Sequence, residues 1–445
     1  MSAVELQTSF SPLDLWLRPA GACGQAVSPD DVAKFASAVF PLLLCYFATA
    51  VLALIPGTAS KAARFALLPV SLSFALDGST SPCYVFHARE LRHLNLGICM
   101  FHITFSLRCI EWAVSKAPLR RVYPQADKAN VEATAHLANG NGHAQVHIGN
   151  GSDMRTGLSG LLIAACDLSV NARGIGWEWG KGCKIPAEWR NTTSRATFLR
   201  QTAWSAAKNL SCFDLAFSIL QLLRPRTHAA STPMGWSIFD PTKSIGYNIA
   251  SALANSFCVA TCVYGADSGI YNLFTIVAVA LGDDPSRWPP LFNSPWAMTS
   301  LADFWSNRWH QLFRRPFILF GGLPGTLIGG RFGGVMGSFI VSGLLHDGAL
   351  WGLRGGMALH QLTAYFILQG FALLLEGAVS RTAGKRVGGV GGRIWATAVI
   401  LVSGALIAEP WMTRGLGYSL FLPTSLRPGW FLLNCVLGIQ PFEPL

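Results

Sequence analysis

The stretch from Phe317 to Leu345, FILFGGLPGTLIGGRFGGVMGSFIVSGLL, is long, apolar and rich in glycine, and it carries one charge, Arg331. About 20 predominantly apolar residues are enough for a helix to cross the hydrocarbon core of a bilayer. The stretch therefore predicts a membrane-spanning helix. Working outward from it, we expect an all-α fold, a polytopic transmembrane helical bundle.

The composition of the whole chain agrees with a membrane environment. Of its 445 residues, 51% are hydrophobic and 13% are charged, whereas a soluble domain is charged at about a quarter of its positions. The mean hydropathy is +0.38. These values exclude a disordered chain and argue against an ordinary soluble enzyme. The net charge of +11 indicates basic loops at the cytoplasmic face of a membrane, and we expect no nucleic-acid partner.

About eight or nine spans are expected, because some short apolar runs could be re-entrant. The first, Phe35–Ile55, would also act as an uncleaved signal anchor after a polar segment at 1–34. We expect one membrane-embedded domain at 35–445, interrupted by a disordered polar loop at about 118–157. The other candidate spans are Phe65–Leu76, Leu94–Leu107, Ile245–Ala266, Ser268–Gly282, Gly356–Leu375 and Ile394–Ala408, with an amphipathic stretch at Trp204–Leu223.

Basic side chains gather in two loops, which the positive-inside rule assigns to the cytoplasmic face. Two interpretations stay open: a topology signal alone, or a docking site for the phosphates of an anionic cosubstrate. The first cluster comprises Arg173, Lys181, Lys184, Arg190, Arg195 and Arg200, and the second comprises Arg308, Arg314, Arg315 and Arg331.

His346 is the strongest candidate for chemistry. It follows the apolar run 339–345, and an ionisable residue in such surroundings is costly to keep and indicates function. A neutral imidazole can accept a proton at cellular pH, as a general base must. A histidine that only bonds a neighbouring helix is the alternative.

A second candidate, His310, ends the aromatic and basic segment Asp303-Phe-Trp-Ser-Asn-Arg-Trp-His310. The two histidines are 36 residues apart, which is about 54 Å along one helix. They can meet only if the chain turns back between them. Pro316, Pro324 and the glycine-rich run supply material for such a break.

Glycines recur at every fourth position in that run, where they would line one ridge of a helix. The ridge predicts close approach of another backbone, or room for a thin acyl or pantetheine arm. The residues are Gly321, Gly325, Gly329, Gly333 and Gly337.

Phe304-Trp-Ser-Asn-Arg-Trp-His310 followed by Ser342-Gly-Leu-Leu-His346-Asp347 resembles the paired signature of the membrane-bound O-acyltransferases, and of their wax-synthase-like branch in particular. Arg173-Gly-Ile-Gly-Trp-Glu-Trp179 is similar to a segment of fungal members of that branch. The resemblance implies acyl-CoA-dependent transfer to a hydroxyl, with His346 as the catalytic histidine. The resemblance leaves the role of His310 open, because much of the superfamily has Asn or Asp at this position.

The residue types suggest how such a transfer would proceed. His346 would take the hydroxyl proton as the oxygen attacks the thioester, and His310 or Asn307 would donate to the developing oxyanion. We expect no metal and no bound cofactor, with acyl-CoA as cosubstrate. The expected substrate-binding residues are Trp305, Arg308, Trp309, Ser342 and Asp347. The expected CoA-binding residues are the six of the first basic cluster with Arg314 and Arg315.

The preferred reading is transfer of an acetyl group to a lipophilic secondary metabolite such as a terpenoid, by a multi-pass protein of the endoplasmic reticulum. A long-chain wax ester synthase is the alternative within the class. A transporter is the alternative outside it, and it would be favoured by an internal inverted repeat. Only one Gly/Pro-broken segment, Pro316–Gly337, is present, without a counterpart in the N-terminal half.

Overall fold

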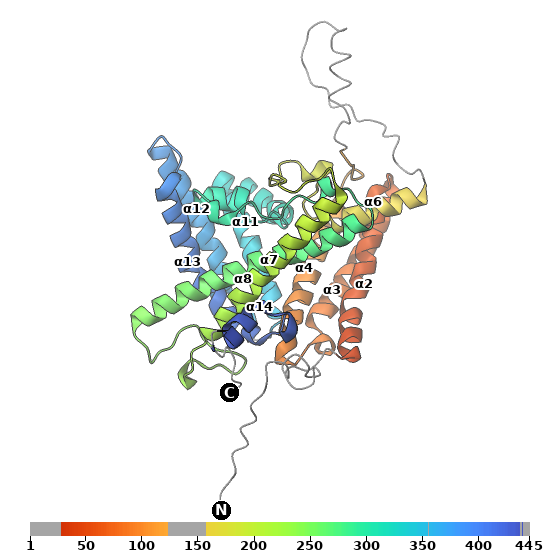
Figure 1. The fold of residues 1–445 in the computed structure, drawn as a ribbon. Helices are drawn as coiled ribbons and strands as arrows, with labels where there is room; N and C mark the ends of the chain where they lie inside the picture. Colours follow the sequence, from red (N-terminus) through yellow and green to blue (C-terminus); the bar gives the residue numbers. More distant parts are fainter. Residues whose placement is uncertain (1–27, 123–156, 355, 437, 439–445) are drawn as a thin grey trace, which may run out of the picture.

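The computed structural model describes residues 28–122, 157–354, 356–436 and 438, and this part of the chain is helical, with two isolated β-bridges and no strand. Seven of its helical segments are long and apolar enough to cross a membrane. The all-α polytopic fold is thus confirmed (Figure 1). These segments contain α2 (Pro29–Leu54), α3 (Thr58–Thr80), α4 (Arg92–Val114), α8 (Ile245–Ala280), α11 (Leu323–Trp351), α12 (Ala364–Thr382) and α13 (Gly389–Thr413).

The first three helices form a bundle on one side of the molecule, with the short α6 (Leu158–Val170) packed against α2 (Figure 1). α2 begins six residues before the expected Phe35, because Ser28 and Asp31 form a capping box that satisfies its first backbone donors. The expected polar loop falls mostly on 123–156, which lie outside the described residues. Its first residues are packed: Leu119 N–H donates to the carbonyl of Ala53.

α7 (Arg195–Leu222) and α8 lie against each other and cross the molecule diagonally (Figure 1). We expected two spans, Ile245–Ala266 and Ser268–Gly282, but α8 is one helix of 36 residues. The reason is close packing on α7. A Cβ added to Gly265 would lie 2.8 Å from the carbonyl oxygen of Asn209. Gly265 thus allows the two backbones to touch without ending the helix.

The segment from Arg314 to Trp351 is a helical hairpin rather than the single span expected over Phe317–Leu345. Its first arm contains α10 (Arg314–Phe317), a π-helical turn and the start of α11. The helix is interrupted at Gly329 and at Gly330, where φ is 54° and ψ is −143°, a conformation that side chains disfavour. The chain turns back there, and not at either proline.

Four of the five glycines form the interface between the two arms of this hairpin, and the fifth, Gly329, lies in the turn. A Cβ added to Gly321 would lie 2.1 Å from the carbonyl oxygen of Gly337, and one added to Gly325 would lie 2.1 Å from that of Gly333. Such contact requires glycine on both sides. Of the two interpretations of the ridge, the structure bears out close backbone packing.

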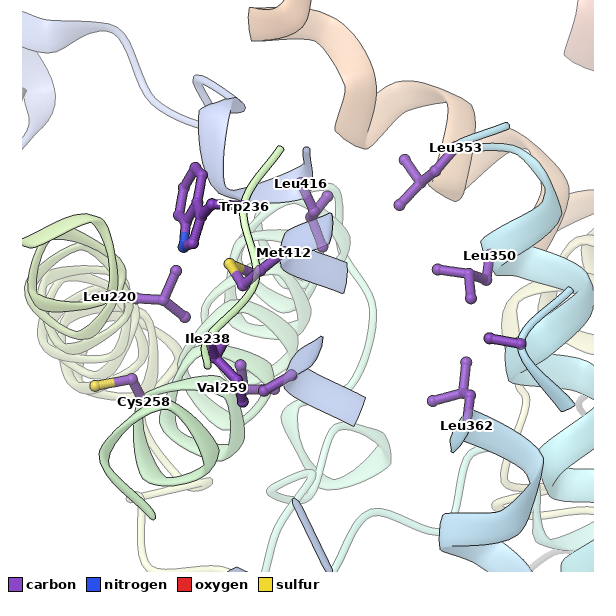
Figure 2. Packing of buried hydrophobic residues seen from close by; sticks show 12 residues of the cluster. Leu220, Trp236, Ile238, Cys258, Val259, Leu350, Leu353, Leu362, Met412 and Leu416 are labelled. Carbon is purple, nitrogen blue, oxygen red and sulfur yellow. The ribbon is translucent and has the colours of Figure 1, made fainter. Parts of the chain in front are cut away.

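The C-terminal helices close the bundle around an apolar core, in which side chains from α7, α8, α11 and α13 converge (Figure 2). α14 (Pro428–Phe431) packs on α7. Next to it, Arg427 Nε donates to the buried Asp214 carboxylate at 2.7 Å. Core residues include Leu220, Trp236, Ile238, Val259, Leu350, Leu362, Met412 and Leu416.

Candidate active site

His346 lies on the second arm of the hairpin with one ring nitrogen bonded and the other uncommitted. Its Nδ1 is 2.7 Å from the carbonyl oxygen of Ser342, so this nitrogen carries the hydrogen and donates it. Nε2 is then the acceptor of a neutral ring. The ring stacks on Phe366 at a centroid distance of 4.5 Å. The geometry orients a proton acceptor.

His102 on α4 shows what a purely structural histidine looks like in this fold. Its Nδ1 lies 2.7 Å from the carbonyl oxygen of Ile98, and its Nε2 lies 3.0 Å from that of Ala38. Both edges of the ring are taken by backbone, and the ring joins α4 to α2. His346 differs in that Nε2 has no such partner in the described part of the chain.

The segment before His310 folds as a π-helical turn, Phe304–Arg308, a rare element that is frequent at functional sites. Asp303 holds it, because its carboxylate accepts from Asn307 Nδ2 at 3.2 Å and from Arg308 Nε at 2.9 Å. Burial by itself would raise the pKa of Asp303, but these bonds outweigh burial and the pKa lies below its ordinary value. The carboxylate therefore remains charged and fixes the turn.

His310 follows this turn and sits among aromatic rings, with Phe292 at 5.4 Å and Phe313 at 5.7 Å between centroids. Burial lowers the pKa of His310 to about 3, and the neighbouring Arg173 guanidinium lowers it further. The ring is therefore neutral at cellular pH.

One cavity of about 1880 Å³ contains both histidines. The turn at the hairpin tip thus allows both histidines to line one cavity, although the sequence separates them by 36 positions. Trp305 also donates from Nε1 to Gln369 at 3.1 Å, which fixes one wall to α12. The expected site residues that line the cavity are His346, His310, Asn307, Trp305, Trp309, Ser342 and Arg314.

Two expected substrate-binding residues do not line the cavity. Arg308 is held by Asp303, and Asp347 is fully buried. The Asp347 carboxylate accepts from the backbone N–H of Ala358 at 2.6 Å and from the backbone and hydroxyl of Thr363. It therefore anchors the π-helical turn Leu359–Thr363 that begins α12, and this bonding favours a structural role.

The two ends of the cavity differ in chemistry. Arg381 and Arg386 line it at the connection between α12 and α13, and Arg331 lines it next to the turn of the hairpin. Leu416, which follows α13, lines the opposite end, because the 25 residues of α13 rise about 37 Å between these points. The lining at that end is apolar and comprises Leu96, Met100, Leu416 and Phe421.

The first basic cluster does not line this cavity. Three of its guanidinium groups are bonded to backbone carbonyls of the segment 279–290: Arg173 to Pro289 and Pro290, Arg190 to Trp288, and Arg195 to Val279 and Gly282. Arg190 also pairs with Glu188. These bonds hold the two loops together at one face of the molecule.

Of the remaining expected CoA-binding residues, Lys181, Lys184 and Arg200 are exposed away from the cavity. Arg315 pairs with the Glu111 carboxylate. Sequence reasoning missed several cavity residues, among them Asp267, Arg381 and Arg386. Asp267 had a signal, since it is the one charge in the apolar stretch that became α8. The two arginines had none beyond a short basic run.

The fold and site define a class: a polytopic helical membrane protein with a histidine-lined cavity between the helices. Residues 288–368, which contain the hairpin and both histidines, match the profile of the membrane bound O-acyl transferase family. The match confirms the resemblance drawn from the two motifs.

Individual relatives show the same similarity over part of their length. The chain is 36% identical over 101 residues to a probable long-chain-alcohol O-fatty-acyltransferase 1 of Arabidopsis thaliana, covering 21% of this chain and 30% of that protein. It is 31% identical over 131 residues to the acetyltransferase aurG of Calcarisporium arbuscula, covering 26% and 30%. It is 33% identical over 120 residues to the acetyltransferase ataH of Aspergillus terreus, covering 24% and 38%. The matched segments span about a third of these relatives.

Proposed function

We propose that the chain is an acyl-CoA-dependent O-acyltransferase in which His346 is the general base. The observation that carries the proposal is the state of its ring: Nδ1 is anchored on the Ser342 carbonyl, and Nε2 is uncommitted beside a cavity with one basic end and one apolar end. A hydroxyl is a poor nucleophile at neutral pH, so a positioned acceptor of its proton is what the reaction requires.

The transfer is a direct exchange on the thioester carbonyl. The acceptor oxygen forms a bond to the carbonyl carbon while its proton moves to Nε2 of His346. The tetrahedral intermediate then collapses, the bond from carbon to sulfur breaks, and the CoA sulfur takes the proton back from the imidazolium. The products are an ester and free CoA, and His346 returns to its neutral form.

Two groups are placed to donate to the oxyanion. Asn307 lines the cavity and uses one amide hydrogen on Asp303, which leaves the other available. His310 is a neutral ring at the cavity wall and has one N–H to offer. Such donors lower the barrier because they are fixed before charge develops.

The arginine-lined end of the cavity suits the phosphates of CoA. Arg331, Arg381 and Arg386 are exposed, and guanidinium groups bind phosphate oxygens in pairs. We therefore place the phosphates at this end instead of on the first basic cluster, and the acceptor at the apolar end. By the positive-inside rule the arginine end faces the cytoplasm, and we propose the endoplasmic reticulum as the membrane.

We propose acetyl transfer to a hydroxyl of a lipophilic secondary metabolite, such as a terpenoid, as the preferred reaction. Two of the relatives described above are named acetyltransferases. A long-chain wax ester synthase is the second candidate, favoured by the cavity volume of about 1880 Å³, which exceeds what an acetyl group needs.

The test uses membranes that contain the full chain. Labelled acetyl-CoA, octanoyl-CoA and palmitoyl-CoA are each incubated with a long-chain alcohol and with a hydroxylated terpenoid, and the ester is measured. His346→Ala is expected to abolish ester formation. His360→Ala is the matched control, since His360 is exposed and lies outside the cavity. Turnover of His346→Ala at the wild-type rate would refute the assignment of the base.

A further inference from the structure

Asp267 is an acid in an unusual place. It is the one charged residue in the 36 residues of α8, and it lines the cavity that contains both histidines. Its side chain is 36% exposed. A carboxylate at this position in a membrane helix is costly to keep. The acyl transfer by His346 and the oxyanion donors does not by itself require it.

The ionisable group that faces this carboxylate is His310. Asp267 Oδ2 lies 3.7 Å from His310 Nε2. That separation is too long for a hydrogen bond, so the N–H of Nε2 is not consumed by the carboxylate. The other ring nitrogen, Nδ1, is buried without a hydrogen-bond partner among the described residues. The two edges of the ring thus meet different surroundings, one beside a carboxyl group and one without a hydrogen-bond partner among the described residues.

We infer that Asp267 is a positioning residue that keeps the hydrogen of His310 on Nε2. The inference rests on the proposed acyl transfer. The carboxyl oxygens of Asp267, 3.7 Å from Nε2, favour the tautomer with the hydrogen on Nε2, because they attract the partial positive charge of that N–H. Because the gap leaves this N–H uncommitted, it stays available to an oxygen of the substrate. Asp267 thereby acts on the oxyanion through His310.

This role predicts a dependence on the chemistry of residue 310. A histidine needs a partner to select its tautomer, whereas an asparagine always carries its amide hydrogens. In the wild-type background Asp267→Asn is expected to lower kcat by about tenfold. This is less than the roughly hundredfold loss in kcat that removal of a whole oxyanion donor causes. In a His310→Asn background the same change is expected to alter kcat by no more than about twofold.

The experiment is a double-mutant cycle with wild type, Asp267→Asn, His310→Asn and the double variant. Kcat and the KM for acyl-CoA are measured in membranes, and folding is checked by size-exclusion chromatography after extraction. Asp267→Ser is assayed in parallel, so that a second variant without the carboxylate is available should the first fail to fold. Asp77→Asn removes a carboxylate from α3, outside the cavity, and is the matched control.

The possible outcomes separate the inference from the proposed function. An equal loss in both backgrounds would mean that Asp267 only supports the structure, and an unchanged or higher kcat in Asp267→Asn would also overturn the inference. A wild-type chain that forms no ester with any acyl-CoA would instead overturn the proposed function. A loss of activity that Asp267→Asn causes only when residue 310 is histidine, and that is seen mainly in kcat, supports the role of Asp267.

Discussion

Replacing Gly337 by alanine tests whether the hairpin sets the distance between the two histidines. The added Cβ would lie 2.2 Å from the carbonyl oxygen of Gly321. Carbon and oxygen approach to about 3.3 Å at closest, so the arms must separate by roughly 1 Å. Overpacking of this kind costs about 1 to 3 kcal/mol. His346 lies on one arm and His310 leads into the other, so the separation also misplaces the site.

A displacement of about 1 Å costs on the order of a hundredfold in rate when it misaligns reacting groups. We therefore expect Gly337→Ala to lower both thermal stability and kcat, measured by the midpoint of thermal aggregation in detergent and by ester formation from labelled acyl-CoA. Gly329→Ala is the control. It adds the same methyl group to the same segment, at the turn, where a Cβ would have no neighbour within 4 Å and φ is −131°. Equal stability and equal kcat in the two variants would refute the argument.

Three further predictions follow from particular contacts. Arg386→Gln is expected to raise the KM for acyl-CoA several-fold, with less effect at high salt. Arg190→Gln is instead expected to lower stability, because Arg190 is buried and pairs with Glu188. Steady-state kinetics with varied acyl-CoA distinguishes the two variants. Burial holds the pKa of His310 at about 3, below the roughly 6.5 of an unfolded chain. The unfolded state therefore binds more protons between these values, and thermal stability should fall as pH falls below about 6.5, less so in His310→Asn. Arg427→Met is expected to destabilise the chain by about 3 to 5 kcal/mol, because it leaves a buried carboxylate unpaired; denaturant unfolding of the purified protein measures it.

The membrane fold could be predicted from the sequence, and so could the presence of a turn between His310 and His346 that lets both line one cavity. Apolar length indicates where membrane helices lie, because the bilayer imposes one strong requirement on every span, but it did not show that Phe317–Leu345 forms a hairpin or that α8 is a single helix. The need for a turn between the histidines followed from helix rise alone. The position of the turn could not be predicted, because proline is a stronger local signal for a helix break than glycine. Gly330 takes up its unusual backbone conformation where the chain turns between the two packed arms.

The roles of the arginines could not be predicted, since they depend on distant partners. Arg173 and Arg381 look equally basic in the sequence. In the structure Arg173 is bonded to the carbonyls of Pro289 and Pro290, while Arg381 is exposed at the cavity. A guanidinium that satisfies backbone carbonyls across a hundred residues is a tertiary feature. Local charge patterning reports where cations are, and not what they contact.

The turn of the hairpin has a consequence for how the chain tolerates change. Gly329 and Gly330 are exposed, and His346 lies sixteen residues beyond Gly330 along the second arm, about 24 Å of helix. The glycine contacts hold the two arms together between the turn and the histidines. Residues added at the turn would therefore project outward without moving either histidine. The turn is therefore a natural position for inserting an epitope tag or a fluorophore that reports which side of the membrane it faces.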